Sequence, residues 1–234
     1  MTFQRARRWL RRRRGARELD VSPQLLPEPT APTAPREDFL QEELRAATFR
    51  IRNLSTVGIG TGAGFAIGSH LIVTNRHVVE RADPLEVTTW DGRPLEVDVA
   101  DLAEGHDLAL LTTVRTLQKR LAFASSPARR GDLVHLIGYP LGGPFSLIRG
   151  VILDHVDGQP FEDSSHVLRV KAVVLPGYSG GPILDARGRV VGVIYAQGRA
   201  SRNALAIPVS SLTRWLDASG PDQFIPQEDS DTDS

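Results

Sequence analysis

Hydrophobic and polar positions alternate over short stretches between about residues 37 and 217, and turn-forming residues separate these stretches. The clearest pair is residues 64–68 and 70–74, two apolar-rich runs that meet at a short turn and predict a hairpin. Further strands are expected at residues 95–99, 108–111, 133–137, 167–170, 182–184 and 190–194. Strands this short, with turns roughly every 8–12 residues, predict an all-β sandwich or barrel rather than alternating β and α units.

Two segments instead carry apolar residues at helical spacing, one at each end of the strand-rich region. The first runs from Glu37 to about Thr48, and the second from Ser210 to Ala218. The apolar residues that share a face are Phe39, Leu40, Leu44 and Ala47 in the first, and Leu212, Trp215 and Leu216 in the second. We therefore expect a short N-terminal helix and a C-terminal helix around the β core.

The ends of the chain differ from the middle in composition. Residues 1–36 hold a cluster of arginines followed by closely spaced prolines, which interrupt helix and sheet hydrogen bonding. Residues 218–234 are acidic and contain few apolar side chains. We predict a folded domain at residues 37–217 between a disordered basic arm with its linker and a disordered acidic tail.

Composition limits the chemistry and the compartment. The 234 residues carry no net charge and no cysteine, which excludes disulfides, a thiol nucleophile and thiolate metal ligands. No apolar run of about 18 residues occurs, and no apolar segment of a signal peptide follows the first arginines. We predict a cytoplasmic protein. The arginine-rich arm is either a solvated tail or a contact with nucleic acid, an anionic membrane or another protein.

The strongest chemical signal is the stretch G-Y-S-G-G-P at residues 177–182. A serine hydroxyl becomes a nucleophile when a base takes its proton, and the resulting oxyanion needs preorganised donors. Gly177 allows a turn in which its own N–H and that of Ser179 point into one oxyanion hole. An α/β-hydrolase also uses G-x-S-x-G, but its histidine follows the serine, and the last histidine here is His166.

The base is therefore expected before the serine, in T-N-R-H-V-V. His77 follows the apolar strand 71–73, where a strand end presents an imidazole to a cleft. Asp107, at the start of the apolar strand 108–111, is the predicted orienting carboxylate, with Asp98 and Asp101 nearby as alternatives. The remaining histidines lack metal-ligand spacing, and we expect neither a metal nor a cofactor.

Together with Gly60–Phe65, read G-T-G-A-G-F, these motifs resemble the trypsin-like peptidases, particularly the bacterial HtrA/Deg branch. The resemblance spans roughly residues 55–217 and includes the closing L-A-I-P at residues 205–208. It implies a chymotrypsin-like fold of two perpendicular six-stranded antiparallel β-barrels that divide near residues 122–130, with the active site between them. No PDZ domain is expected after the last helix, although HtrA proteins usually carry one.

The resemblance also implies where a substrate binds. The walls of the side-chain pocket would come from Val173, Val174, Ile194, Tyr195 and Ala196, the last three also pairing with the substrate backbone. None of these residues is acidic, so we expect a small or medium apolar residue before the scissile bond.

The sequence thus predicts a serine endopeptidase that acts on proteins or peptides through His77, Asp107 and Ser179, with a homo-oligomer left open. The alternative is a latent or non-turnover peptide-binding or sensor module on the same fold, activated by a partner. A nucleic-acid-binding function would require a basic stripe in the folded region, and the sequence offers no clear one.

Overall fold

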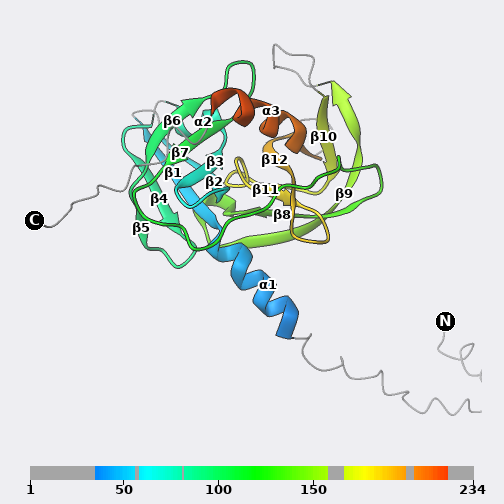
Figure 1. The fold of residues 1–234 in the computed structure, drawn as a ribbon, viewed down its shortest axis with the longest axis horizontal. Coiled ribbons are helices and arrows are strands. Elements are labelled where there is room, and N and C mark those ends of the chain that lie inside the picture. Colours follow the sequence, from blue (N-terminus) through cyan, green and yellow to red (C-terminus); the bar gives the residue numbers. More distant parts are fainter. Residues whose placement is uncertain (1–34, 56–57, 81, 158–165, 199–202, 221–234) are drawn as a thin grey trace, which may run out of the picture. The chain divides into compact units, whose positions relative to one another are not determined.

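The computed structural model describes residues 35–55, 58–80, 82–157, 166–198 and 203–220. Residues 1–34 and 221–234, where we predict a disordered arm and tail, lie outside the described residues. From Arg36 onward the chain belongs to one unit, and Figure 1 shows that most of its described elements are strands.

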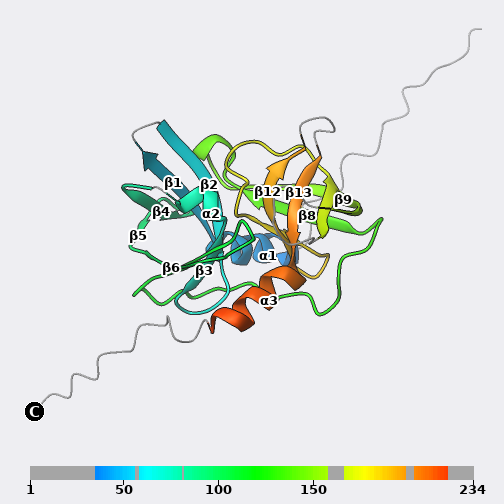
Figure 2. The same cartoon turned by 90° about the horizontal axis from the view of Figure 1, so that it is seen from above.

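The first half of this unit is a seven-stranded antiparallel sheet with the strand order β5-β4-β1-β2-β3-β7-β6. Figure 2 shows this half on the left. Its strands are β1 Thr48–Ser55, β2 Gly58–Ala66, β3 Leu71–Thr74, β4 Leu85–Thr89, β5 Pro94–Leu95, β6 Asp98–Leu102 and β7 Ala109–Thr112. Six strands were expected here, and the sheet exceeds that number by one. β5 is only two residues long.

The second half is a closed six-stranded barrel with the order β10-β13-β12-β11-β8-β9. Its strands are β8 Leu133–Gly138, β9 Ser146–Asp157, β10 His166–Lys171, β11 Pro182–Leu184, β12 Val190–Gln197 and β13 Ala204–Pro208. A short 3-10 helix, η1 at Pro140–Gly142, lies between β8 and β9. Two barrel-like sheets with few helices confirm the predicted chymotrypsin-like fold class.

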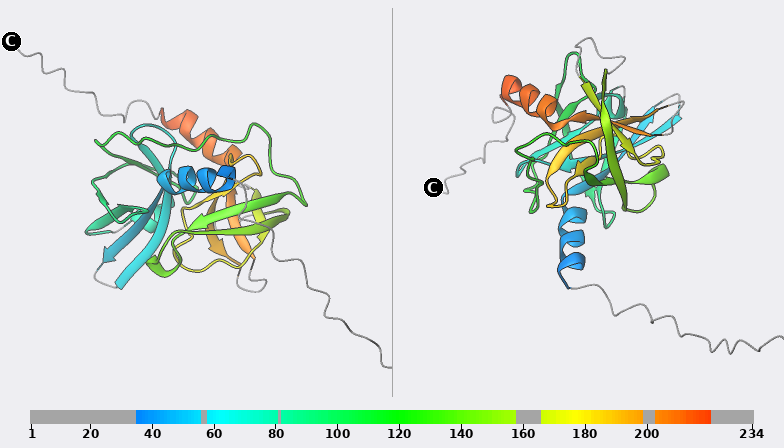
Figure 3. Two further views of the ribbon diagram at one scale, coloured as in Figure 1. Left: turned by 90° about the horizontal axis from the view of Figure 1, so that it is seen from below. Right: turned by 90° about the vertical axis from the view of Figure 1, so that its right-hand side faces the viewer.

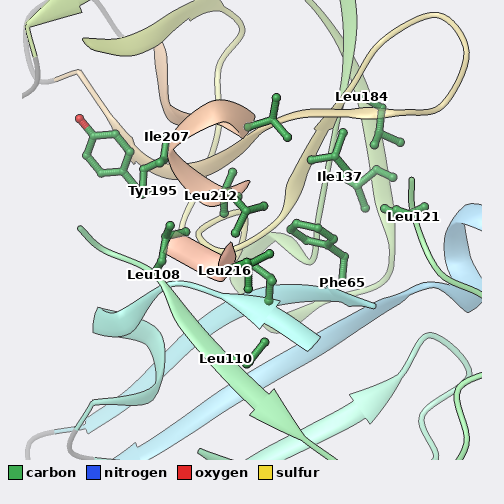
Figure 4. Packing of buried hydrophobic residues seen from close by; sticks show 14 of the residues in the cluster. Phe65, Leu108, Leu110, Leu121, Ile137, Leu184, Tyr195, Ile207, Leu212 and Leu216 are labelled. Carbon is green, nitrogen blue, oxygen red and sulfur yellow. The ribbon is translucent and has the colours of Figure 1, made fainter. Parts of the chain in front are cut away.

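One hydrophobic cluster joins the two halves (Figure 4). Phe65 and Leu110 enter it from the first sheet, and Ile137 and Ile207 enter it from the barrel. All four side chains are 0–1% exposed, and burial of each such side chain contributes roughly 1.5–3 kcal/mol. The cluster therefore holds the two sheets together at their contact.

Helices close this cluster. α3, Val209–Ser219, inserts Leu212 and Leu216 into it (Figure 4), and α1, Pro35–Ala46, contributes Leu44 from its last turn. Figure 3 shows the two helices, α1 in blue and α3 in orange-red, from two further sides. α3 ends at Gly220, which adopts the left-handed conformation. Both predicted helices are confirmed, although the N-terminal one ends at Ala46 and Thr48 already belongs to β1.

Two strand predictions differ from the structure. The alternating stretch 95–99 was predicted to be one strand, and this is wrong: β5 ends at Leu95 and β6 begins at Asp98. These two strands stand at opposite ends of the strand order, so the chain must leave one edge of the sheet before it joins the other. The predicted division near 122–130 falls in the segment between β7 and β8.

Candidate active site

The register of two neighbouring strands brings His77 and Asp107 to the same place. β3 and β7 are antiparallel, and Thr74 pairs with Ala109 at the end of their ladder. The residues just after β3 and just before β7 must therefore lie side by side. His77 follows on the one-turn helix α2, Arg76–Val79, and Asp107 precedes β7 by two residues.

Asp107 accepts two hydrogen bonds from His77. The His77 backbone N–H lies 2.9 Å from Oδ1, and the ring Nδ1 lies 2.5 Å from Oδ2. A carboxylate can only accept, so the pair assigns the proton to Nδ1 and leaves Nε2 as an acceptor. The His77 side chain is 50% exposed and that of Asp107 is 15% exposed. The imidazole is therefore accessible to solvent, whereas the carboxylate that orients it is largely buried.

Asn75 holds the backbone of Asp107 by a hydrogen bond. The sequence analysis did not assign a role to this residue. Its side chain is fully buried, and its Nδ2 donates to the backbone carbonyl of Asp107 at 2.7 Å. The signal was available in principle, because a buried asparagine directly after an apolar strand needs a hydrogen-bond partner.

Ser179 lies in the loop before β11 and contacts both halves of the fold. Its carbonyl accepts the Ala63 N–H from β2 at 2.7 Å, and the next N–H, that of Gly180, donates to Ile194 in β12 at 2.7 Å. Gly180 has a φ of +83°, and a Cβ there would lie 2.2 Å from the Ala63 carbonyl oxygen. Only glycine therefore fits beside the serine, and the serine backbone is held between β2 and β12.

The Ser179 hydroxyl donates to the carbonyl of Tyr195 at 3.5 Å. Among the hydrogen bonds of the described residues, none joins this hydroxyl to His77. The structure thus brings His77 and Asp107 into direct contact, and the serine hydroxyl is turned toward β12.

The predicted oxyanion donors occupy a tight turn. Gly177 has a φ of +105°, and the Tyr178 N–H closes the turn on the Leu175 carbonyl at 3.2 Å. Within the described part of the chain, the N–H groups of Gly177 and Ser179 donate to no other protein atom. Both donors are therefore available for an oxygen atom of a bound molecule.

Tyr195 accepts the Ser179 hydroxyl at its backbone carbonyl, and its phenol is influenced by the charge of Asp107. The register of β12 against β13 shifts between Ile194 and Ala196, which makes Tyr195 the extra residue of a β-bulge. Burial, and after it the negative charge of Asp107, raise the pKa of the Tyr195 phenol. The phenol is accordingly a neutral group beside the carboxylate at ordinary pH.

The predicted specificity residues are not equally exposed. Val173 is 63% exposed, whereas Val174 and Ile194 are 4% and 1% exposed and pack in a hydrophobic cluster of the barrel. Tyr195 is 8% exposed, and Ala196 is partly buried. Of these five residues, Val173 alone is exposed to solvent.

The described residues contain no group of three or more His, Asp or Glu side chains that could hold a metal ion. No described helix is both long and apolar enough to span a bilayer.

The model of the trypsin-like peptidase domain matches residues 62–193, which is more than half of the chain. The chain belongs to the trypsin-like peptidase family. The matched residues extend from β2 to β12 and include His77, Asp107 and Ser179.

Relatives within this family include HtrA-type proteases, as the motifs predicted. Serine protease Rv3671c of Mycobacterium tuberculosis is 33% identical over 141 residues, which cover 57% of this chain and 35% of that protein. Serine protease Do-like HtrB of Bacillus subtilis is 37% identical over 134 residues, covering 52% of this chain and 29% of that protein. The chain thus matches about a third of the length of these curated relatives.

A solved protease has a similar architecture. The crystal structure of the active form of the Rv3671c protease from M. tuberculosis superposes with a TM-score of 0.71 at 26% identity. The superposition covers 83% of this chain and 94% of that one.

Proposed function

We propose that this chain is a serine endopeptidase that hydrolyses peptide bonds through an acyl-enzyme, with His77, Asp107 and Ser179 as its catalytic residues. The observation that carries the proposal is the double hydrogen bond from His77 to Asp107. It orients the ring and assigns its proton, and it does so in a chain of the trypsin-like peptidase family.

In the proposed acylation step, the Ser179 hydroxyl rotates from the Tyr195 carbonyl toward Nε2 of His77. Nε2 takes the proton while Oγ attacks the substrate carbonyl carbon. The imidazolium that forms is stabilised by Asp107. The two oxygens of this carboxylate already accept the backbone N–H and the Nδ1–H of His77. Nε2 then returns the proton to the leaving amine as the peptide bond breaks.

The N–H groups of Gly177 and Ser179 would bind the oxyanion of the tetrahedral intermediate. Support comes from the positive φ of Gly177 and from the absence of another acceptor for either N–H in the described residues. Such donors are worth roughly 10²–10³ in kcat each. Water then attacks the acyl-enzyme with His77 again acting as base, and Ser179 is released.

The substrate backbone would bind along residues 194–196, because the Tyr195 carbonyl lies 3.5 Å from the nucleophilic oxygen. A small or medium apolar residue before the scissile bond stays our prediction. Its support is the exposed apolar side chain of Val173 in the segment leading to Ser179. A library of peptides that differ only at this residue tests it, with cleavage expected after Ala or Val and not after Arg.

The orientation of the serine favours a second candidate, a latent peptidase or peptide sensor that a partner activates. The Ser179 hydroxyl donates to Tyr195 and has no hydrogen bond to His77, so the hydrogen bond between nucleophile and base is not formed in this arrangement. Under this alternative the isolated chain binds peptides without cleaving them until the partner is added.

We further propose that the chain acts on proteins or peptides, that it forms a homo-oligomer and that it is located in the cytoplasm. Their support is the family and the composition of the chain. The contact of the arginine-rich arm with nucleic acid, membrane or protein also stays a prediction, because the arm lies outside the described residues.

The proposal is tested by incubating the purified chain with an unfolded protein and following new N-termini. We expect cleavage by the wild type and a loss of roughly 10⁶ in kcat for Ser179→Ala. Ser210→Ala, a change on an exposed serine of α3, is the matched control and should cleave as the wild type does. Undiminished cleavage by Ser179→Ala would overturn the assignment.

A further inference from the structure

Tyr139 connects two parts of the chain that are distant in sequence. It follows β8 directly, and its side chain is 1% exposed. Its backbone N–H donates to the Gly177 carbonyl at 2.9 Å, and its phenol donates to the Thr48 carbonyl at 3.0 Å. One residue therefore links the loop of the candidate oxyanion hole to the junction between α1 and β1.

The loop that starts at Tyr139 holds the oxyanion loop at two successive carbonyls. Besides the bond to Gly177, the Leu141 N–H donates to the Pro176 carbonyl at 2.6 Å. In a planar trans peptide the C=O and the N–H point in opposite directions. Holding the Pro176 carbonyl on the Leu141 side therefore directs the Gly177 N–H away from that loop.

The two loops are in close contact, and no side chain fits between them at Gly177. A Cβ on Gly177 would lie 2.1 Å from the Tyr139 carbonyl oxygen and 3.0 Å from the Leu141 nitrogen. The peptide plane between Pro176 and Gly177 is therefore set by the loop that follows β8.

Leu141 adopts an unusual backbone conformation to make this contact. Its φ is 55° and its ψ is 26°, and it is the one non-glycine residue with a positive φ in the described part of the chain. Its side chain is 71% exposed, so packing of the side chain does not explain the conformation. Such backbone strain persists where surrounding contacts enforce it, and here the bond to Pro176 is such a contact.

The hydrogen-bond acceptor of the Tyr139 phenol is also held in place by its neighbours. Thr48 donates its own hydroxyl to the Leu44 carbonyl in α1 at 3.0 Å, so the acceptor of the phenol is fixed to the last turn of that helix. Burial raises the pKa of the Tyr139 phenol to about 12, which keeps it a neutral donor. The Phe145 ring meets the Tyr139 ring edge-on at 6.2 Å, and the Arg45 guanidinium lies 5.3 Å from the Phe145 ring.

We propose that Tyr139 is a positioning residue for the oxyanion hole, which makes the direction of the Gly177 N–H depend on the docking of the α1–β1 junction. The inference rests on the proposed function of Gly177 as an oxyanion donor. Activity would then respond to whatever holds or displaces the N-terminal helix, although this helix supplies no catalytic group.

The kinetic test compares Tyr139→Phe with the wild type in the full chain. Removing the phenolic oxygen should lower kcat about tenfold, less than the roughly 10²–10³ lost with a whole oxyanion donor, and leave KM within about twofold. The affinity for a peptide boronic acid, which forms a tetrahedral adduct, should fall by the same factor. Ile51→Val, a buried change in the first sheet, is the control and should alter neither quantity.

A second readout is independent of catalysis. Hydrogen–deuterium exchange of residues 175–181 should be several-fold faster in Tyr139→Phe than in the wild type, and unchanged in Ile51→Val. Equal exchange in Tyr139→Phe and the wild type, or an equal rise in Ile51→Val, would overturn the inference. An inactive wild type would contradict the proposed function instead, and the exchange rates would still decide whether Tyr139 holds the loop.

Discussion

Replacing Asp107 with asparagine tests the orientation of the imidazole most sharply. The carboxylate accepts the His77 backbone N–H on Oδ1 and the ring Nδ1–H on Oδ2. An amide offers one acceptor oxygen, so it must turn its NH₂ toward one of these two donors. If the NH₂ faces the ring, Nδ1 becomes the acceptor and the proton moves to Nε2, where it blocks proton transfer from Ser179.

The expected loss in kcat is about 10⁴-fold at neutral pH, because the wrong tautomer is populated while the site keeps its shape. At 1.36 kcal/mol per tenfold change, this corresponds to about 5 kcal/mol of transition-state stabilisation. KM should change little, since Asp107 does not face the substrate in the proposed mechanism. Steady-state hydrolysis of a fluorogenic peptide gives both constants.

Asp101→Asn is the matched control, because Asp101 was an alternative candidate for the orienting carboxylate. Its oxygens accept the Leu102 N–H at 2.8 Å and the Ser219 hydroxyl at 2.6 Å, away from His77. We expect kcat within about twofold of the wild type for this variant. Activity of folded Asp107→Asn above about a tenth of the wild type, or an equal loss in Asp101→Asn, would refute the reasoning.

Three further predictions concern the loop, the core and acid stability. Gly177→Ala should lower kcat by about 10²–10³-fold, because its Cβ would lie 2.1 Å from the Tyr139 carbonyl oxygen and displace an oxyanion donor. A variant that hydrolyses a peptide with the kcat of the wild type would contradict this. Leu212→Ala should lower the free energy of unfolding by about 2–5 kcal/mol in urea titrations, since the side chain is fully buried in the cluster that joins the two sheets. Burial alone would raise the pKa of Asp185, but hydrogen bonds from the Arg189 N–H and guanidinium outweigh it and hold that pKa below its ordinary value. This pair therefore stabilises the fold above the ordinary carboxyl pKa and loses its contribution as pH falls through the lowered one. Asp185→Asn should lose about 1 kcal/mol at pH 7 and nothing once the wild-type group is protonated, and equal losses at both ends of a pH series of urea titrations would count against it.

The candidate site could be proposed from the sequence because each predicted catalytic residue has a recognisable local sequence context. Glycines on both sides of Ser179 and an apolar strand before His77 are readable without knowing the fold. Asp107 was harder to distinguish from Asp98 and Asp101, the other candidates for the orienting carboxylate. The contact that distinguishes it depends on the register of Thr74 against Ala109, which no local pattern reveals.

The errors have a different origin, since they depend on contacts between distant segments. The stretch 95–99 alternates as a strand should, yet the chain divides it between the two ends of the sheet. Residues 49–52 also alternate, but the helical pattern that extends to Ala47 was continued into Thr48. The role proposed for Tyr139 was invisible, because the two hydrogen bonds that suggest it join Tyr139 to Gly177 and Thr48, which lie far from it in the sequence.

The central claim is that Ser179 is a nucleophile activated by His77, and covalent labelling tests it most directly. The purified wild type is incubated with a fluorophosphonate, and the modified residue is identified by mass spectrometry, with His77→Ala treated in parallel. The account predicts a single adduct on Ser179 that is lost in His77→Ala. A folded wild type that is not labelled, or labelling of Ser179 that persists without His77, would contradict it.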